Sequence, residues 1–174
     1  MHSDYRLRGV DEFDRDFLEQ MFVVAADWNP QRALGEDHWR TEGMLEKYVG
    51  AWRDGSDFGF LIEADSEPIG AIWMRYFDAA DPGYGFVDEQ TPEITLGVRE
   101  CLRGQGVGSA LLLAAQEAAP ARLSLSVEDG NRAIRLYESV GFVPVGRVGN
   151  STTMLWSPDA HAAPNVGWRG HPLD

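Results

Sequence analysis

A glycine-rich stretch is the part of the sequence whose residue types and spacing most clearly suggest chemistry. Gly104, Gly106 and Gly108 lie at alternate positions, directly before a run rich in Ala and Leu that we expect to be a helix. Glycine is unfavourable inside a helix, but it allows a tight turn or a close approach of the backbone to a ligand. Because the first N–H groups of a helix have no intrahelical partners and attract negative charge, this turn predicts an anion site, typically for phosphate.

Three kinds of phosphate loop compete for this stretch. A Walker loop needs a lysine followed by Ser or Thr after its last glycine, and the single lysine of the chain, Lys47, is far away. Gly104, Gly106 and Ser109 match the small positions of a dinucleotide fingerprint. Glu128 ends the next expected strand, where that fingerprint places a ribose-binding acid. The long connection RECLR and the position of the loop in mid-chain argue against a dinucleotide-binding loop. A nucleotide-dependent oxidoreductase therefore stays open as a minor alternative to a protein with an acyl-CoA loop.

The segment LRGQGVGSALL resembles the acyl-CoA signature of the GNAT superfamily of N-acetyltransferases. That signature, Gln/Arg-x-x-Gly-x-Gly/Ala, is met by Arg103, Gly106 and Gly108. In that family a strand ending in a small and an apolar residue precedes the loop, as EITLGV does here. The next helix of the family carries an Asn near its start and a later Tyr, and closes on Gly-Phe. Over residues 93–147 the matching residues are Asn131, Tyr137, Gly141 and Phe142.

The resemblance implies a GNAT-like fold of the α/β (α+β mixed) class. Its sheet would be mixed, mostly antiparallel, of about six to seven strands and splayed at the centre, with about four helices around it. The pantetheine arm of acetyl-CoA would pair with the open edge of the strand before the glycine loop. We expect Gly97 to ease a bulge there that frees backbone groups. The resemblance assigns acetyl-CoA binding to Leu96, Gly97, Val98, Arg103, Gly104, Gln105, Gly106, Val107, Gly108, Ser109, Asn131 and Tyr137.

The resemblance also implies an activity, the direct transfer of an acetyl group from acetyl-CoA to a primary amine of a small molecule or peptide. A non-catalytic acyl-CoA-binding module of the same fold is the alternative. The reaction needs a base for the ammonium proton, hydrogen-bond donors for the oxyanion and an acid for the departing thiolate. The backbone N–H of Val98 is the expected oxyanion donor.

Tyr137 is the candidate acid. Its helical pattern turns the phenol to the inward face, beside the turn at Asn131, where it would reach the sulfur. A core tyrosine whose hydroxyl pairs elsewhere is the alternative. The residues at i, i+3, i+4 and i+7 of this face are Ala133, Leu136, Tyr137 and Val140.

Glu93 is the candidate base. It starts the strand EITLGV with parity opposite to Ile94 and Leu96, so it can face the cleft and take a proton through a water. Burial would raise its pKa towards a useful value. An exposed acid at the strand end is the alternative, and Asp88 and Glu89 in the preceding loop are reserves.

Other reactive or aromatic residues receive weaker predictions. Cys101 has no nearby histidine in the sequence, so we expect a small buried side chain rather than a covalent nucleophile. Trp28 is a candidate for acceptor recognition, and His38 would either line the acceptor cleft or lie on the helix surface. No metal is expected, because no metal-ligand spacing links the histidines. These are His2, His38, His161 and His171.

The charge of the chain is uneven. Its 15 basic and 28 acidic residues give a formal net charge of −13. Residues 1–95 hold this whole excess, with 8 basic and 21 acidic side chains. Nucleic acid is therefore not an expected partner, because phosphate neutralisation needs a basic surface. The acidic half would attract a small cationic amine or peptide amine, or would only keep the protein soluble.

The length and the apolar runs set the remaining expectations. A chain of 174 residues suits one domain, and we expect a single GNAT domain over 1–157 and an irregular C-terminal tail over 158–174. The runs MFVVAA and ALLLAA are too short to span a membrane, and no signal peptide is visible. A cytoplasmic protein that is a monomer or a homodimer is expected.

The elements that would position the candidate residues follow from periodicity. In the second half, strands alternate with helices, which predicts a mixed sheet covered by helices. Two helices are expected near the N-terminus, over 11–28 and 36–52. The first would place Phe13, Phe17, Met21 and Val24 on one face. The second would bury Trp39, Leu45, Tyr48, Val49 and Trp52.

Overall fold

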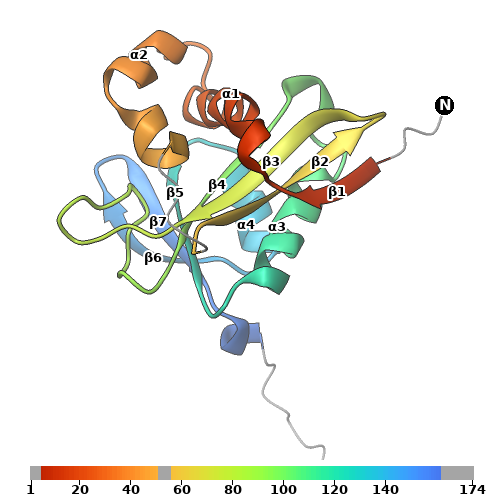
Figure 1. The fold of residues 1–174 in the computed structure, drawn as a ribbon. Coiled ribbons are helices and arrows are strands. Elements are labelled where there is room, and N and C mark those ends of the chain that lie inside the picture. Colours follow the sequence, from red (N-terminus) through yellow and green to blue (C-terminus); the bar gives the residue numbers. More distant parts are fainter. Residues whose placement is uncertain (1–4, 51–55, 162–174) are drawn as a thin grey trace, which may run out of the picture.

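The computed structural model describes residues 5–50 and 56–161. Within them, one seven-stranded sheet runs in the order β1-β2-β3-β4-β5-β7-β6, and all neighbouring strands except β4 and β5 are antiparallel (Figure 1). The predicted fold class is confirmed. The strands are β1 (Tyr5–Gly9), β2 (Phe58–Ala64), β3 (Glu67–Arg75), β4 (Glu93–Val98), β5 (Leu123–Glu128), β6 (Val143–Val148) and β7 (Ser151–Trp156).

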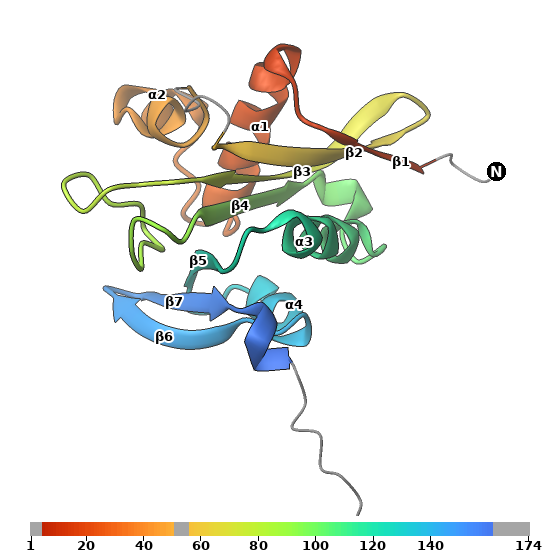
Figure 2. The ribbon, with the colours of Figure 1, turned by 60° about the horizontal axis from the view of Figure 1, so that its bottom comes forward.

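Helices cover both faces of the sheet. Figure 2 shows α1 and α2 on one side of β2, β3 and β4, and α3 on the other. β3 separates two hydrophobic cores, because its side chains alternate: Trp73 packs with α1, whereas Ile72 and Met74 pack with α3 and α4. The α-helices are α1 (Arg15–Ala26), α2 (Glu36–Thr41), α3 (Val107–Ala118) and α4 (Ala133–Ser139). Shorter helical turns are η1 (Glu12–Asp14), η2 (Glu46–Gly50), η3 (Glu100–Leu102) and η4 (Pro158–His161).

The sheet splays between β4 and β5, as predicted. These parallel strands pair in register only at Glu93 and Ser124, and the Ser124 N–H donates to the Pro92 carbonyl at 3.0 Å. Beyond this point the strands diverge, so the facing edges of β4 and β5 are not joined. The gap faces the N-terminus of α3 and the start of α4, and it is the feature of the fold that opens a site.

Gly97 has a different structural role from the one predicted. β4 pairs with β3 through Gly97 without a shift in register, so the expected bulge is not found in this part of the described sheet. A Cβ atom at Gly97 would lie 2.7 Å from the Cβ of Met21 on α1. Glycine is needed here because α1 packs directly onto the backbone of β4.

The N-terminal helical segments are shorter than predicted. α1 begins only at Arg15, after η1, so Phe13, which was expected on one helical face with Phe17 and Met21, lies on the preceding turn and is 86% exposed. The segment 36–52 is not one helix, because Gly43 adopts a φ of +73° between α2 and η2. Its predicted buried residues Leu45, Tyr48 and Val49 are buried, Trp39 is partly buried, and Trp52 lies outside the described residues.

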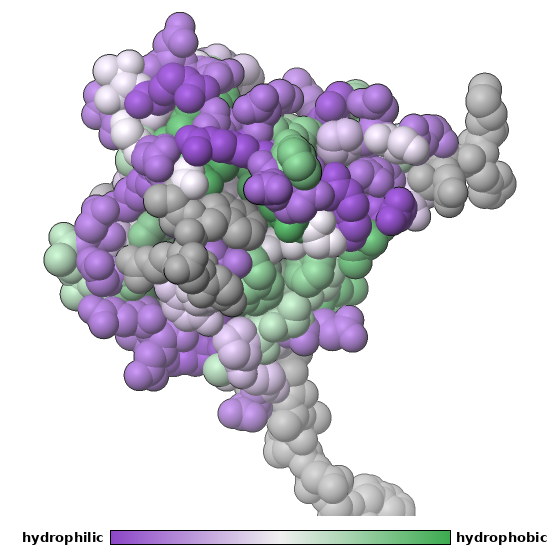
Figure 3. Space-filling model, in the orientation of Figure 1, coloured by the Kyte–Doolittle hydropathy of each residue, from purple (hydrophilic) through white to green (hydrophobic). Residues whose placement is uncertain are grey.

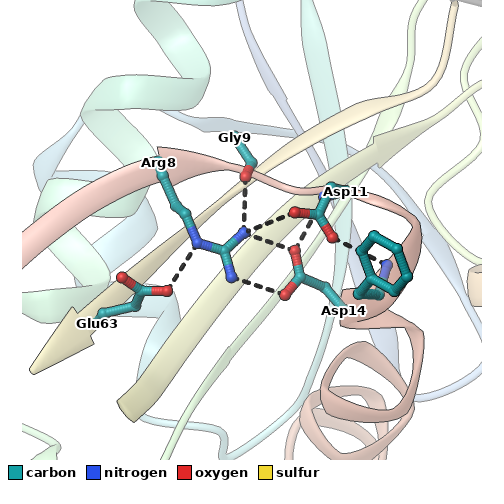
Figure 4. A network of polar contacts seen from close by, with 6 residues as sticks. Arg8, Gly9, Asp11, Asp14 and Glu63 are labelled. Atoms are coloured by element: carbon teal, nitrogen blue, oxygen red, sulfur yellow. Dashed lines mark hydrogen bonds and ion pairs between the residues drawn. The ribbon is translucent and has the colours of Figure 1, made fainter. Parts of the chain in front are cut away.

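Arg8 on β1 holds the start of α1 against the sheet (Figure 4). Its guanidinium donates two hydrogen bonds, of 2.7 and 2.8 Å, to the carboxylate of Asp14. Its Nε donates to Glu63 on β2 at 2.7 Å, and Asp14 also accepts the Asp11 N–H at 2.9 Å. The hydrogen bonds from Arg8 hold the pKa of Asp14 below its usual value. This bidentate pair fixes the helix that forms one wall of the site.

Hydrophilic residues predominate over α1 and α2 on the face drawn in Figure 3. Some of the acids on these helices are already paired with cations. Glu19 on α1, for example, accepts from Arg15 at 3.1 Å and from Arg40 on α2 at 2.7 Å. The ion pair between Glu19 and Arg40 therefore joins α1 to α2.

η4 follows β7, and the residues after it lie outside the described part, so the boundary at residue 157 stays a prediction. No helix within 5–50 and 56–161 combines the length and the apolar character that a membrane span requires.

Candidate active site

A cavity of about 670 Å³ lies where β4 and β5 diverge. Its walls come from α1 and the loop after it, from β4 and β5, from the glycine loop and from α4. The predicted site residues that line it are Glu93, Leu96, Gly97, Val98, Arg103, Gly104, Gly108, Asn131 and Tyr137. Those that do not are Gln105, Gly106, Val107 and Ser109.

The open edge of β4 presents backbone groups to this cavity. The Arg99 N–H bonds to the Ile69 carbonyl on β3, whereas the Pro92 carbonyl accepts from β5. Because backbone groups of successive residues in a strand point to alternate sides, the N–H and C=O groups of Leu96 and Val98 point to the β5 side. That side is the splay, so these groups are available to a ligand that lies between the strands.

The glycine loop has the backbone conformation of an anion site. Gly104 and Gly106 have φ angles of +75° and +88°, in the left-handed region that favours glycine. Gly106 caps α3 without a side chain, and the Ala110 N–H makes the first helical bond, to the Gly106 carbonyl at 3.0 Å. The N–H groups before Ala110 have no partners within the helix, so they can bind an anion.

Two loop residues that were predicted to bind a ligand use their side chains elsewhere. Val107 is buried in the core between α3 and the sheet. The Gln105 side chain donates to the Cys101 carbonyl at 3.2 Å. Any contact of these residues with a ligand would therefore come from the backbone.

Two lining residues have clear structural roles as well. The Asn131 side chain accepts the Ala133 N–H at 3.0 Å and so stabilises the start of α4. A Cβ atom at Gly108 would lie only 3.1 Å from Cδ2 of Leu136, so glycine allows α3 to approach α4 closely. Both residues shape the wall that carries Tyr137.

Tyr137 lines the cavity from α4. Its ring packs edge-on against Phe142, with 6.1 Å between ring centroids. Burial alone raises the pKa of its hydroxyl to about 12, and none of the described residues forms a hydrogen bond with it. The phenol therefore keeps its proton at neutral pH and is free to donate it.

Glu93 is buried at the start of β4, so the alternative of an exposed acid is wrong. Its Oε1 accepts a hydrogen bond from the Tyr48 hydroxyl at 3.1 Å, while Oε2 has no partner in the described part of the chain. Burial raises the pKa of Glu93 to about 7. The Gly85 N–H, the Tyr48 hydroxyl and the Lys47 charge act in the opposite direction, so burial is the dominant cause. Such a group can accept a proton near neutral pH.

Tyr48 is a site residue that the sequence analysis placed only in the core. Its hydroxyl accepts the Tyr84 N–H at 2.7 Å and donates to Glu93, so one oxygen joins η2, the loop before β4 and β4 itself. Helical periodicity predicted that Tyr48 is buried, but no local signal connects it to residues more than thirty positions away.

The reserve bases lie away from the cavity. Asp88 forms an ion pair with Arg122 at 2.6 Å, and Glu89 accepts the Ala79 N–H at 3.3 Å. Neither lines the cavity. Glu93 is therefore the better-placed of the three candidate bases.

Trp28 lines the cavity, as expected of a residue near an acceptor, but its indole N–H already forms a hydrogen bond within the protein. Its Nε1 donates to Glu128 on β5 at 2.6 Å, and Arg32 donates to the same carboxylate at 3.1 Å. Asn150 completes this cluster with a bond of 2.8 Å to Glu128. The acid that a dinucleotide site would use for ribose is thus occupied, which argues against that alternative.

The remaining candidates lie outside the cavity. His38 packs edge-on against Trp39 with ring centroids 5.0 Å apart and is exposed on α2. Cys101 is exposed on η3, so its predicted burial is wrong. Among the described residues, no group of three His, Cys, Asp or Glu side chains is arranged to hold a metal ion.

Comparison with known proteins identifies a family and a fold. The model of the Acetyltransferase (GNAT) family matches residues 15–142. No curated protein sequence matches the chain.

Solved structures share the fold at low sequence identity. The paia N-acetyltransferase of Thermoplasma acidophilum in complex with coenzyme A is 16% identical, with a TM-score of 0.65 over 88% of this chain and 99% of that chain. The yncA protein of Salmonella typhimurium with its cofactor acetyl-CoA is 21% identical, with a TM-score of 0.59 over 93% and 98%. A chimera of the spermidine N-acetyltransferase SpeG, from Vibrio cholerae and hSSAT, is 17% identical, with a TM-score of 0.57 over 88% and 95%.

The contact between Tyr48 and Glu93 gives a testable pKa prediction. The hydroxyl stabilises the charged carboxylate, so Tyr48→Phe should raise the pKa of Glu93 further above about 7. Carbon NMR of the side-chain carboxyl groups measures this value, and the spectrum of Glu93→Gln assigns the signal. Tyr84→Phe is the matched control, because it keeps the N–H that bonds to Tyr48. A native pKa near the ordinary value of 4.5 would contradict the account.

Proposed function

Because the chain belongs to the acetyltransferase (GNAT) family, we propose that it transfers an acetyl group from acetyl-CoA directly to a primary amine of a small molecule or peptide. The observation that carries this proposal is that Glu93, Tyr137 and the open edge of β4 border one cavity. A base, an acid and a set of backbone hydrogen-bonding groups are the parts that acyl transfer to an amine requires.

The residues present fit acetyl-CoA as the donor. The backbone groups of Leu96 and Val98 suit the amides of an extended pantetheine arm, which would lie in the splay as an added strand. The glycine loop offers N–H groups at the start of α3, and Arg103 adds a positive charge at the cavity wall for the pyrophosphate. When bound, acetyl-CoA supplies the acetyl group and a thiolate leaving group.

The chain supplies the proton transfers. Glu93 accepts the proton of the ammonium group through a water and is ionised at pH values above its pKa of about 7. Tyr137 holds a proton for the departing sulfur, because its own pKa of about 12 keeps the hydroxyl neutral. The Val98 N–H, which faces the splay, donates to the developing oxyanion.

A non-catalytic acyl-CoA-binding module is the alternative. Binding alone needs the strand edge and the glycine loop but has no use for a buried carboxylate. Burying Glu93 without an ion pair is unfavourable for folding, and such exceptions are expected at functional sites. Glu93 and Tyr137 together therefore favour the enzyme.

An amine acceptor draws support from the solved structures and from the charge. One of the similar structures is named as a spermidine N-acetyltransferase, and the acidic excess of residues 1–95 would attract a cation. The cytoplasmic location and the choice between monomer and homodimer stay predictions from the sequence.

The proposed function is tested by release of free thiol from acetyl-CoA with a panel of primary amines. We expect release that depends on the amine and equals the acetylated product measured by mass spectrometry. Tight binding of acetyl-CoA without amine-dependent release would instead support the binding module.

The same thiol-release assay tests whether Tyr137 is the general acid. Tyr137→Phe keeps the ring and removes only the ionisable proton. Turnover should fall by about 10²-fold or more, the range of general acid catalysis, while the dissociation constant of acetyl-CoA stays the same. A full rate in this variant would mean that the thiolate leaves unaided and that Tyr137 only packs.

The pyrophosphate site gives a separate prediction. Valine at Gly106 or Gly108 would strain the loop or displace Leu136, so Arg103→Gln is the cleaner variant. Its affinity for CoA should fall about tenfold, or about 1.4 kcal/mol, because a charge near the phosphates is lost. Its affinity for pantetheine, which has no pyrophosphate, should not change. The matched control is Arg135→Gln on the exposed side of α4. Equal losses for CoA and pantetheine would contradict this placement of the phosphates.

A further inference from the structure

The carboxylates on the cavity wall differ in how far they are already occupied. In the described residues these are Asp27, Glu93 and Glu128. Asp27, at the end of α1, accepts the Leu34 N–H and the Trp39 Nε1–H at 3.0 Å each and the Gly35 N–H at 2.8 Å. Its carboxylate holds the loop between α1 and α2 in place, so it has little capacity left for a ligand.

Glu128 is occupied to a similar extent. It accepts from Trp28, Arg32 and Asn150, and the positive charge of Arg32 pairs with it. The Arg32 guanidinium also lies 5.6 Å above the ring centroid of Trp28. Arg32 therefore takes both the carboxylate and the π face that a ligand cation would use at this end of the cavity.

Glu93 is different. Its Oε1 accepts a hydrogen bond from Tyr48, its Oε2 has no hydrogen-bond partner, and no ion pair within the described residues neutralises it. Glu93 is thus the carboxylate of the described cavity wall that keeps one oxygen without a hydrogen-bond donor. An acceptor whose ammonium approaches Glu93 finds no second carboxylate of this kind along the wall.

The wall next to Glu93 is aromatic. Tyr48 stacks on Tyr84 with ring centroids 6.1 Å apart and contacts Phe22 at 5.3 Å. Phe22 meets Trp39 edge-on at 5.9 Å, so four neighbouring rings from α1, α2, η2 and the loop before β4 line this part of the cavity. Such a surface binds an apolar body well, and it attracts a cation only through ring faces.

We infer that the acceptor is a primary amine with a single positive charge on an apolar, alkyl or aryl body, and that diamines and polyamines are poor acceptors. A second ammonium group would lose its water without gaining a carboxylate. A cation–π contact offsets only part of that desolvation, and the carboxylate at the far end, Glu128, is already neutralised by Arg32. The inference rests on the proposed transferase function and narrows its substrate class.

A matched pair of acceptors tests the inference. Hexylamine and 1,5-diaminopentane have the same number of non-hydrogen atoms and differ in one terminal group, methyl against ammonium. The value of kcat/KM per amine group, from thiol release at one ionic strength, should be at least about tenfold larger for hexylamine. Values within a factor of two after correction for the two amines of the diamine, or a preference for the diamine, would overturn it.

A gain of specificity tests the physical cause. Leu34 lines the cavity from the loop after α1 and is 55% exposed, so a polar side chain there is compatible with folding. With diamines of increasing length, Leu34→Glu should raise the ratio of kcat/KM for the diamine to that for the monoamine at least about fivefold at one chain length. Leu34→Gln, which lacks the charge, should leave the ratio unchanged. No change at any length with Leu34→Glu would overturn the explanation by a missing carboxylate.

Thiol release with the amine panel separates a failure of the proposed function from a failure of the inferred acceptor class. If no amine in the panel supports thiol release, the proposed function is wrong, and the inference falls with it. If diamines or spermidine are acetylated as well as hexylamine, the transferase stands and only the inferred acceptor class is wrong.

Discussion

β4 and β5 pair at a single point, and the candidate site arises from the way they separate beyond it. Strand edges inside a domain are normally joined, because unpaired backbone groups are unfavourable when water is excluded. Here the strands pair at Glu93 and Ser124 and then separate. The separation leaves backbone groups of β4 free for a ligand, places the first turn of α3 at the same opening and makes room for a cavity of about 670 Å³.

The packing around the splay assigns different protonation states to two groups on one cavity. Glu93 is fixed at the last paired position, where burial raises its pKa to about 7 and the Tyr48 hydroxyl limits the rise. Tyr137 lies on α4, where burial raises its pKa to about 12. A pair of groups whose environments separate their pKa values in this way suits one base and one acid. Gly97 and the Arg8 network maintain the arrangement by holding α1 close to β4.

Local patterns in the sequence were enough for the parts of the site that depend on one element. Spacing within a few residues predicts the glycine loop, the inward face of α4 and the parity of Glu93. The order of these motifs along the chain is what resembles the family. Contacts between distant segments were beyond such patterns. The bond between Tyr48 and Glu93 and the occupation of Glu128 by Arg32 join residues 45 and 96 positions apart. The reason for Gly97, its contact with Met21 on α1, was missed for the same reason.

The pH dependence of kcat/KM shows whether Glu93 is the base of an amine acetyltransferase. The native protein should show a rate that rises with pH through about 7, because Glu93 must lose its proton to act. Glu93→Gln should abolish this limb and keep any limb at higher pH that arises from the amine itself. Tyr137→Phe should lower the rate and leave the limb near 7 in place. A limb near 7 that persists in Glu93→Gln would contradict the account.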